Sequence, residues 1–445
     1  MRAMTTQILK LTPVAALMVA ALPALATNGM NMEGYGPIST GMGGASQAIE
    51  HGTAAMAQNP ATLALMAPGA RVDVALGMLG PKVASSVPGA PTAESGGTSY
   101  IMPAFGYARR SGALTYGIGV FAQGGMGTEY AGSSFFTNSA FGGSGKATRS
   151  ELGVGRVLLP LAYQVTPEFA VGATLDFMWA TLDMKMEASG AMLGGLVTGA
   201  SGNLAAALPS LGGAPWARID FSDGSDFSGE ATSTGWAGKL GMVFKASPTV
   251  TLGASYQFKS SLKDMKTGAG GASMSATGGF LDTGRMTVID FQWPTTWGAG
   301  VAWQATPALL IAADVKKLEW SGVMKDFKLR YDSGGMGGSV SFALPQNWKD
   351  QTITNIGVAY AVNAQLTLRG GVNLADNPIP EAFVHPLFPA TVEKHYTLGV
   401  GYKMSPTSEF NGSLTLAPTA TVTNGMGVTI THKQTNVQLM YTHRF

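Results

Sequence analysis

Cysteine and charge are the two things that this sequence has little of. The 445 residues include no cysteine, which excludes disulfide scaffolds, thiolate metal centres and cysteine nucleophiles. Charged residues make up 12%, about half of the roughly 25% that is usual in soluble domains. The net charge of +2 gives no electrostatic basis for binding nucleic acid. A protein that faces lipid has a reason to carry so few charges, whereas a soluble globule does not.

Long hydrophobic runs are also missing, apart from a short one near the start of the chain. Arg2 and Lys10 precede the apolar stretch 11–22, and Ala24-Leu25-Ala26 is a small-residue cleavage site, so residues 1–26 are predicted to be a signal peptide. No later segment reaches the roughly 18 consecutive apolar residues of a membrane-spanning helix. Because only helices and closed barrels satisfy backbone polar groups in hydrocarbon, an exported lipid-facing chain of this kind is expected to form a β-barrel.

Glycine and two-residue alternation are what the sequence does have. Glycine accounts for 61 residues, and most of the chain alternates apolar side chains with Gly, Thr, Ser or Gln. In the segment 169–179, for example, Phe169, Val171, Leu175 and Phe177 alternate with small or polar residues. This period is typical of strands with one face toward lipid and the other toward a lumen.

Short turns of one form recur between these strands. In four of them an aromatic residue is followed by two residues, Ser or Thr, and proline, and a new strand begins after the proline. A fifth turn lacks the proline, and a sixth is looser. If both ends of the barrel lie in the periplasm, six such turns predict 14 strands. The fold class is therefore predicted to be all-β, a 14-stranded antiparallel transmembrane β-barrel. The six turns lie at 163–167, 244–248, 303–307, 402–406, 360–364 and 107–112.

The connections at the opposite end are longer and more variable, as extracellular loops are. We place the barrel at 70–445 and a small N-terminal plug at 27–69, inside the lumen. The alternation of the last strand ends in the terminal aromatic Phe445, as is common in outer-membrane barrels. The loops are expected at 81–98, 124–150, 185–232, 265–285, 321–350, 376–393 and 419–430.

Motifs in the plug and in the last third of the chain resemble one known family. The plug contains Gly41, Gly43 and Gly44, followed by Asn59-Pro60-Ala61, and a block Leu-Pro-Gln-Asn-Trp-Lys-Asp occupies 344–350. Together they resemble the long-chain fatty acid transporter (FadL) family and its TodX-type relatives. The chain departs from this pattern at Gly52, where the family often has Asp, and at His443, where another aromatic residue is usual.

The resemblance implies a monomeric barrel with an internal hatch, taking up hydrophobic molecules by diffusion. It further implies exit sideways through the wall near a kinked third strand, at about 113–123. Gly117 and Gly119 are the candidate kink residues, although these glycines could equally mark strand and loop breaks.

Apolar side chains on the face assigned to the lumen are candidates for lining a ligand site. Met30 and Met32 of the plug are added because methionine adapts to varied shapes, with packing against the wall as the alternative. Arg156 lies among these residues and could pair with a ligand carboxylate, or instead with Asp176 or Asp314. Inward Lys316 has the same two interpretations. The candidates are Met30, Met32, Met102, Phe121, Leu152, Val154, Arg156, Leu158, Met178 and Lys316.

Motifs for catalysis, metal or cofactor binding are poor. Asp332-Ser333-Gly334 has no evident His and Asp partners, Gly145-Lys146 is followed by Ala147 instead of Ser or Thr, and the five histidines lack metal-ligand spacing. We therefore expect no enzyme, no metal, no cofactor and no nucleic-acid partner.

The sequence predicts a passive outer-membrane channel for long-chain fatty acids or hydrocarbons. Its expected partners are a hydrophobic small molecule, outer-membrane lipid and the barrel assembly machinery. The alternatives are a general diffusion porin, an outer-membrane lipid hydrolase and a surface adhesin.

Overall fold

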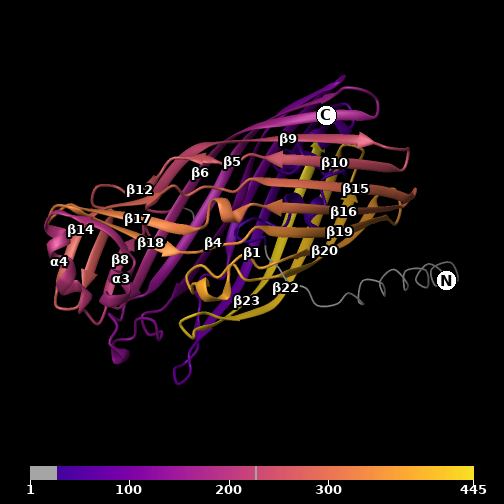
Figure 1. Ribbon diagram of the computed structural model, residues 1–445. Coiled ribbons are helices and arrows are strands. Elements are labelled where there is room, and N and C mark those ends of the chain that lie inside the picture. Colours follow the sequence, from indigo (N-terminus) through magenta and orange to yellow (C-terminus); the bar gives the residue numbers. More distant parts are fainter. Residues whose placement is uncertain (1–27, 226–227) are drawn as a thin grey trace.

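The structure, a computed structural model, describes residues 28–225 and 228–445. The strands of this part of the chain form one antiparallel β-sheet that closes into a barrel (Figure 1). The predicted signal peptide, residues 1–26, lies outside the described residues. Within the described part of the chain, no helix is both long enough and apolar enough to cross a membrane.

The strands vary in length from two to twenty residues. They are β1 (Gly69–Ser86), β2 (Ala93–Glu94), β3 (Tyr100–Ser111), β4 (Leu114–Tyr130), β5 (Thr148–Gln164), β6 (Phe169–Ala188), β7 (Val197–Ser201), β8 (Ala217–Phe221), β9 (Ala231–Lys245), β10 (Val250–Gln257), β11 (Ser261–Leu262), β12 (Met265–Lys266), β13 (Ala272–Ala276), β14 (Phe280–Ile289), β15 (Thr296–Thr306), β16 (Leu309–Leu318), β17 (Asp326–Ser333), β18 (Ser339–Pro345), β19 (Gln351–Ala361), β20 (Leu366–Ala375), β21 (Lys394–Lys403), β22 (Ser408–Thr423) and β23 (Thr429–Arg444). The helices are α2 (Gly36–Thr40), α3 (Gly190–Gly195) and α4 (Gly202–Gly212), with 3₁₀ turns η1 (Gly52–Ala57), η2 (Pro60–Leu65), η3 (Ser139–Phe141), η4 (Trp320–Gly322) and η5 (Glu381–Phe383).

The barrel closes because the last strand pairs with the first. β23 pairs with β1 from Arg71 opposite Arg444 to Ser86 opposite Thr429. The hairpins that join β9 to β10 and β15 to β16 lie at one end of the barrel, and β14, β17, α3 and α4 lie at the other (Figure 1). Each of the six predicted turns joins two consecutive strands that pair antiparallel.

The predicted count of 14 strands is wrong, because the described sheet contains 23. Segments assigned to the loops at 185–232, 265–285 and 321–350 form further strands, which pair with one another as β8–β13, β14–β17 and β7–β18. β6 alone has 20 residues, whereas a tilted strand needs only about 9–11 to cross the hydrocarbon. The sheet therefore continues well beyond the span that the lipid-facing alternation marks.

Side chains on the two faces of the wall differ as the alternation predicts. Large apolar residues such as Leu76, Leu161 and Leu240 are about half exposed on the outside, although a membrane covers this face of an outer-membrane barrel. Polar residues such as Asn355 and Asn411 are buried on the inner face, beside the N-terminal segment. The core of the molecule is therefore the filled lumen.

The N-terminal segment, residues 28–68, occupies that lumen. α2 contacts β21, β22 and β23, while η2 contacts β5, β6 and β9 on a different part of the wall. Nearly every residue from Tyr35 to Ala64 is buried. It stays a prediction that this segment acts as a plug. The division of the chain into a plug at 27–69 and a barrel at 70–445 also stays a prediction.

Candidate functional site

The hydrogen-bonded wall is interrupted between β3 and β4. Their ladder runs from Ser111 opposite Leu114 only as far as Phe105 opposite Val120. β3 extends five residues beyond this point toward its start at Tyr100, and β4 continues to Tyr130. The two strands therefore diverge over most of the length of β4.

The divergence coincides with a bulge in β4. The register between β4 and β5 shifts between Ala122 and Gly124, and Gly124 has a φ of 155°. Gly124 forms a bridge with Asn31, and the Gly125 N–H donates to the Met30 carbonyl at 3.1 Å. β4 thus exchanges its wall partner β3 for the N-terminal segment.

The candidate kink residues Gly117 and Gly119 lie before this bulge, in regular pairing with Ala108 and Gly106 of β3. A Cβ on Gly119 would approach Phe121 and Met56 to 2.6 and 2.9 Å. The missing side chain of Gly119 therefore leaves room for Phe121 and Met56 inside the lumen. The irregularity of β4, the third strand of the wall, lies a few residues later, at Gly124.

A cavity of about 390 Å³ opens at this interruption, within the roughly 300–1,000 Å³ typical of small-molecule sites. Residues of both faces of the wall line it. Met102, Phe121 and Val154 point inward, whereas Ile101, Val120 and Trp179 belong to the outward face. A cavity confined to the lumen would be lined by inward residues alone, so this one reaches the gap in the wall.

Six of the ten candidate lining residues border this cavity. They are Met30, Met32, Met102, Phe121, Leu152 and Val154. The sequence analysis did not include Trp179, Val120 and Ile101, because their alternation assigns them to lipid. It also missed His395 and His432, inward residues whose positions near the cavity depend on the register of distant strands.

The other four candidates lie elsewhere in the lumen. Leu158 packs against the N-terminal segment in a cluster with Met56 and Leu63, and Met178 is fully buried beside Arg156. Lys316 donates from Nζ to the Gly44 carbonyl at 2.8 Å and borders a small polar cavity.

Arg156 is fully buried and ion-paired, with 2.9 Å between its Nη1 and Asp176 Oδ2. The same nitrogen donates to Gln257 Oε1 at 3.2 Å, and the guanidinium lies over the Tyr35 ring. Of the two interpretations of Arg156, the pair with Asp176 is the one that the geometry realises.

The glycines of the predicted plug motif lie where backbone packs closely on backbone. Gly43 has a φ of 68°, its N–H donates to Thr397 Oγ1 at 2.9 Å, and a Cβ there would overlap the Val372 backbone. A Cβ on Gly41 would lie 2.9 Å from Gly399 Cα, and one on Gly44, whose φ is 85°, would overlap the Glu33 carbonyl. The glycines therefore allow backbone to pack directly on backbone.

Asn59 joins the N-terminal segment to itself and to β9. Its Oδ1 accepts from the Ala61 N–H at 3.1 Å and caps η2, which begins at Pro60. Its Nδ2 donates to the Gln47 carbonyl at 2.7 Å and to the Met242 carbonyl of β9 at 3.0 Å. All the hydrogen-bonding groups of this fully buried amide side chain are thereby used.

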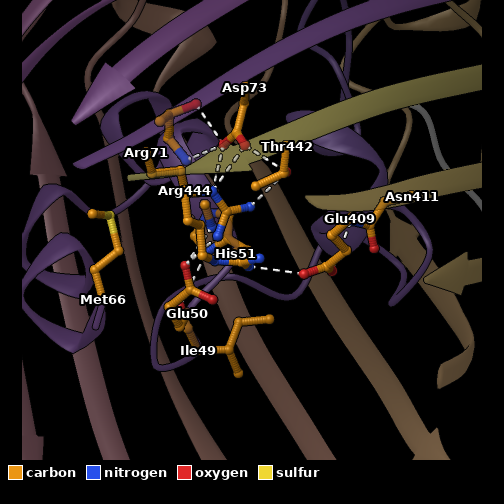
Figure 2. Close-up of polar contacts among 12 residues, drawn as sticks. Ile49, Glu50, His51, Met66, Arg71, Asp73, Glu409, Asn411, Thr442 and Arg444 are labelled. Carbon is orange, nitrogen blue, oxygen red and sulfur yellow. Dashed lines mark hydrogen bonds and ion pairs between the residues drawn. The ribbon is translucent and has the colours of Figure 1, made fainter. Parts of the chain in front are cut away.

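A charged cluster holds the same segment at the end where the chain enters β1. Figure 2 shows Arg71 between the carboxylates of Glu50 and Asp73, at 3.1 and 2.8 Å. Asp73 Oδ2 accepts from both the N–H and the Oγ1 of Thr53 at 2.8 Å. At Gly52, which has a φ of 78°, a Cβ would lie 2.5 Å from Arg71 Nη2, so the family's frequent Asp has no room here.

His51 lies in this cluster and is buried. Its Nδ1 is 3.0 Å from the Ile49 carbonyl, and burial lowers its pKa to about 4. The ring is therefore neutral at physiological pH.

Comparisons with known proteins identify the family. A family model described as outer membrane protein transport protein (OMPP1/FadL/TodX) matches residues 14–439. The chain belongs to this family. The match confirms the predicted resemblance, the outer-membrane location, and the prediction of a channel for hydrophobic small molecules instead of an enzyme.

Solved structures of similar proteins agree. The toluene transporter TodX of Pseudomonas putida is 30% identical, with 93% of this chain and 99% of that chain covered and a TM-score of 0.83. The toluene transporter TbuX of Ralstonia pickettii is 31% identical over the same shares, with a TM-score of 0.78. A FadL homologue of Pseudomonas aeruginosa, 16% identical over 94% of this chain and 100% of that one, shares the fold with a TM-score of 0.72.

One curated relative matches a short part of the chain. It is an uncharacterized protein of Chlorobium limicola, named for its position in the 5′ region of the phosphoenolpyruvate carboxykinase gene, and is 51% identical over 53 residues. The match covers 12% of this chain and 26% of that relative's length.

Proposed function

We propose that the chain takes up uncharged hydrophobic molecules, aromatic hydrocarbons foremost, and releases them sideways between β3 and β4. The observation that carries this proposal is the cavity lined by both faces of the wall. A molecule held between Met102 and Val154 is already beside Val120 and Trp179, which face lipid. Transfer along this route is downhill for an apolar solute, so it needs no energy source.

The charges around the cavity favour a neutral substrate over a fatty acid. A carboxylate that leaves water needs a compensating donor, and Arg156 is already paired with Asp176. Lys316 is engaged by the Gly44 carbonyl, away from the large cavity. The names of TodX and TbuX, both toluene transporters, point to the same substrate class.

We further propose that residues 28–68 act as a plug that blocks straight passage to the periplasm. The contacts of Asp73 and Lys316 with this segment, and of Asn59 in the segment with Met242 of β9, support that role. The protein would act as a monomer, inserted by the barrel assembly machinery through its terminal strand and Phe445. A general diffusion porin would need an open aqueous path, which the filled lumen argues against.

A bulky residue beside the gap, on the outer face of β5, tests the route. Gly153 faces outward, borders the cavity, and a Cβ there would meet only Thr181 Oγ1, at 3.3 Å. Gly153→Trp should lower toluene uptake by outer-membrane vesicles about tenfold or more. Gly412→Trp is the matched control, since Gly412 also faces outward but lies on β22, away from the gap.

Wild-type uptake by Gly153→Trp at equal expression would show that release does not use this gap. Swelling of liposomes in sugars should stay slow for all three proteins. Fast swelling of the wild type would favour the diffusion porin.

A further inference from the structure

We infer that the outer face of β1 and β23 binds a phosphorylated lipid of the outer leaflet through Lys82 and Lys433. The two lysines lie directly opposite each other in the ladder that closes the barrel. Both are exposed. Lys82 has the same alternation as the outward Met78 of β1, and Lys433 has that of the outward Leu439 of β23. Both ammonium groups therefore belong to the face of the wall that meets the membrane.

Strand geometry gives the level of this pair along the barrel. Val72 pairs with Tyr107, which begins one of the six short turns, and Lys82 lies ten residues farther along β1. Ten residues of a strand span about 33 Å, or about 25 Å along the membrane normal at a tilt near 40°, which is the height of the apolar band of an outer-membrane barrel. The lysines therefore reach the head groups of the leaflet opposite the short turns, which is the outer leaflet.

Within residues 28–225 and 228–445, neither lysine has a carboxylate oxygen within 4 Å of its ammonium. Lys317, by contrast, is paired with Asp350 at 3.3 Å. Glu94 shares the outer face of β1 as the partner of Ala84, but it forms no ion pair with Lys82. Like charges that lie directly opposite each other in a ladder repel, and an anion that contacts both relieves the repulsion.

The surroundings favour a phosphate that is attached to a lipid. The Cβ atoms of directly opposed residues are about 5 Å apart, so two lysine side chains can contact oxygens of one phosphate. Toward the middle of the membrane, the same face presents Met78 and Leu439, which suit acyl chains. In a bacterial outer leaflet, the phosphorylated lipid is lipid A, the glycolipid anchor of lipopolysaccharide.

A third lysine extends the row of cations. Lys394 alternates outward with Tyr396 on β21, and Tyr396 pairs with Leu416 of β22. Leu416 in turn pairs with Thr435, the outward residue next to Lys433. Lys394 is therefore two strands away from Lys433, about 10 Å at the usual spacing. Lipid A carries a phosphate at each end of its disaccharide, and this row offers a cation to each.

The test measures lipid binding to the full barrel, purified from outer membranes and delipidated in detergent, by native mass spectrometry. Wild type should bind bisphosphorylated lipid A about tenfold more tightly than the same lipid without its phosphates, as expected when charge-assisted contacts are lost. Lys433→Glu should abolish this preference. Its carboxylate would lie opposite Lys82 as a favourable cross-strand pair, so the barrel should stay folded on semi-native gels. Lys259→Glu is the matched control, because Lys259 is also exposed and follows the outward Phe258 but lies just after β10, on another part of the wall.

The comparison of the two lipids on wild type does not depend on the folding of any variant. Equal binding of both lipids by wild type would overturn the inference, as would an equal loss of lipid A in Lys433→Glu and Lys259→Glu. Millimolar inorganic phosphate should leave lipid A bound. Displacement by phosphate would show that the lysines take a free anion, which would overturn the assignment to a lipid.

Discussion

Replacement of Gly52 by alanine tests how the N-terminal segment is held in the barrel. The position has a φ of 78°, which costs an alanine about 1 kcal/mol. The new Cβ would also lie 2.5 Å from Arg71 Nη2 and 2.6 Å from Asp73 Oδ2. One of these buried, paired charges must then move away from its partner.

The expected magnitude follows from that ion pair. Removing one partner of a buried pair costs about 3–5 kcal/mol, which is the ceiling for displacing the side-chain ends of Arg71 or Asp73. Gly52→Ala should therefore lower stability by more than the backbone strain alone and by at most about 4–6 kcal/mol. Gly112 provides the matched control, because it also has a positive φ, 61°, but nothing lies within 4 Å of its Cβ position. Gly112→Ala should cost only about 1 kcal/mol.

Movement of Asp73 in Gly52→Ala would weaken its hydrogen bond with Thr53, which joins the N-terminal segment to the wall. The segment should therefore loosen while the barrel still assembles. Liposome swelling in sugars should be faster for Gly52→Ala than for Gly112→Ala, and semi-native gels should show both barrels folded. Equal swelling rates for the two variants would refute the argument that Arg71 and Asp73 hold the segment.

Three further predictions concern the same interior. Asn59→Ala should lower uptake without preventing barrel assembly, because it breaks the cap of η2 and the bond to β9; unchanged uptake at equal expression would reduce the motif to packing. Arg156→Ala should destabilise the barrel by about 3–5 kcal/mol in urea titrations and weaken all ligands alike, because Asp176 loses its partner; a selective loss of oleate binding would restore the carboxylate role. Unfolded His51 binds a proton near pH 6.5 but the buried ring only near pH 4, so stability should fall by up to about 3 kcal/mol as pH drops through this window, and His51→Gln should flatten the pH profile of thermal unfolding.

Much of the barrel could be predicted because its physics is local. A strand between lipid and lumen must alternate, and a turn that reverses it without spare residues favours Ser, Thr and Pro. Those two signals located all six hairpins. The strand number failed because the sheet extends beyond the span of the lipid-facing alternation. There the inner face still packs on the core, but the turns need not be short. β8 and β13 are held by pairing with each other, which neither segment reveals alone.

The site was only partly predictable for a related reason. Alternation selected Met102, Phe121, Leu152 and Val154, and these inward apolar residues border the cavity. It could not select Trp179, which the same rule assigns to lipid and which joins the cavity only because β4 leaves β3. That departure depends on pairing between Asn31 and Gly124, which are far apart in sequence.

The scarcity of charge that marks the sequence has a structural counterpart in how the interior is divided. Asp73, Arg71, Lys316 and Asp314 all contact or support the N-terminal segment, so the inward charges hold the lumen filled. Few are left to face a passing solute, and the cavity beside the gap is correspondingly apolar. The same distribution of charged residues therefore holds the segment in place and leaves a cavity suited to uncharged hydrophobic molecules.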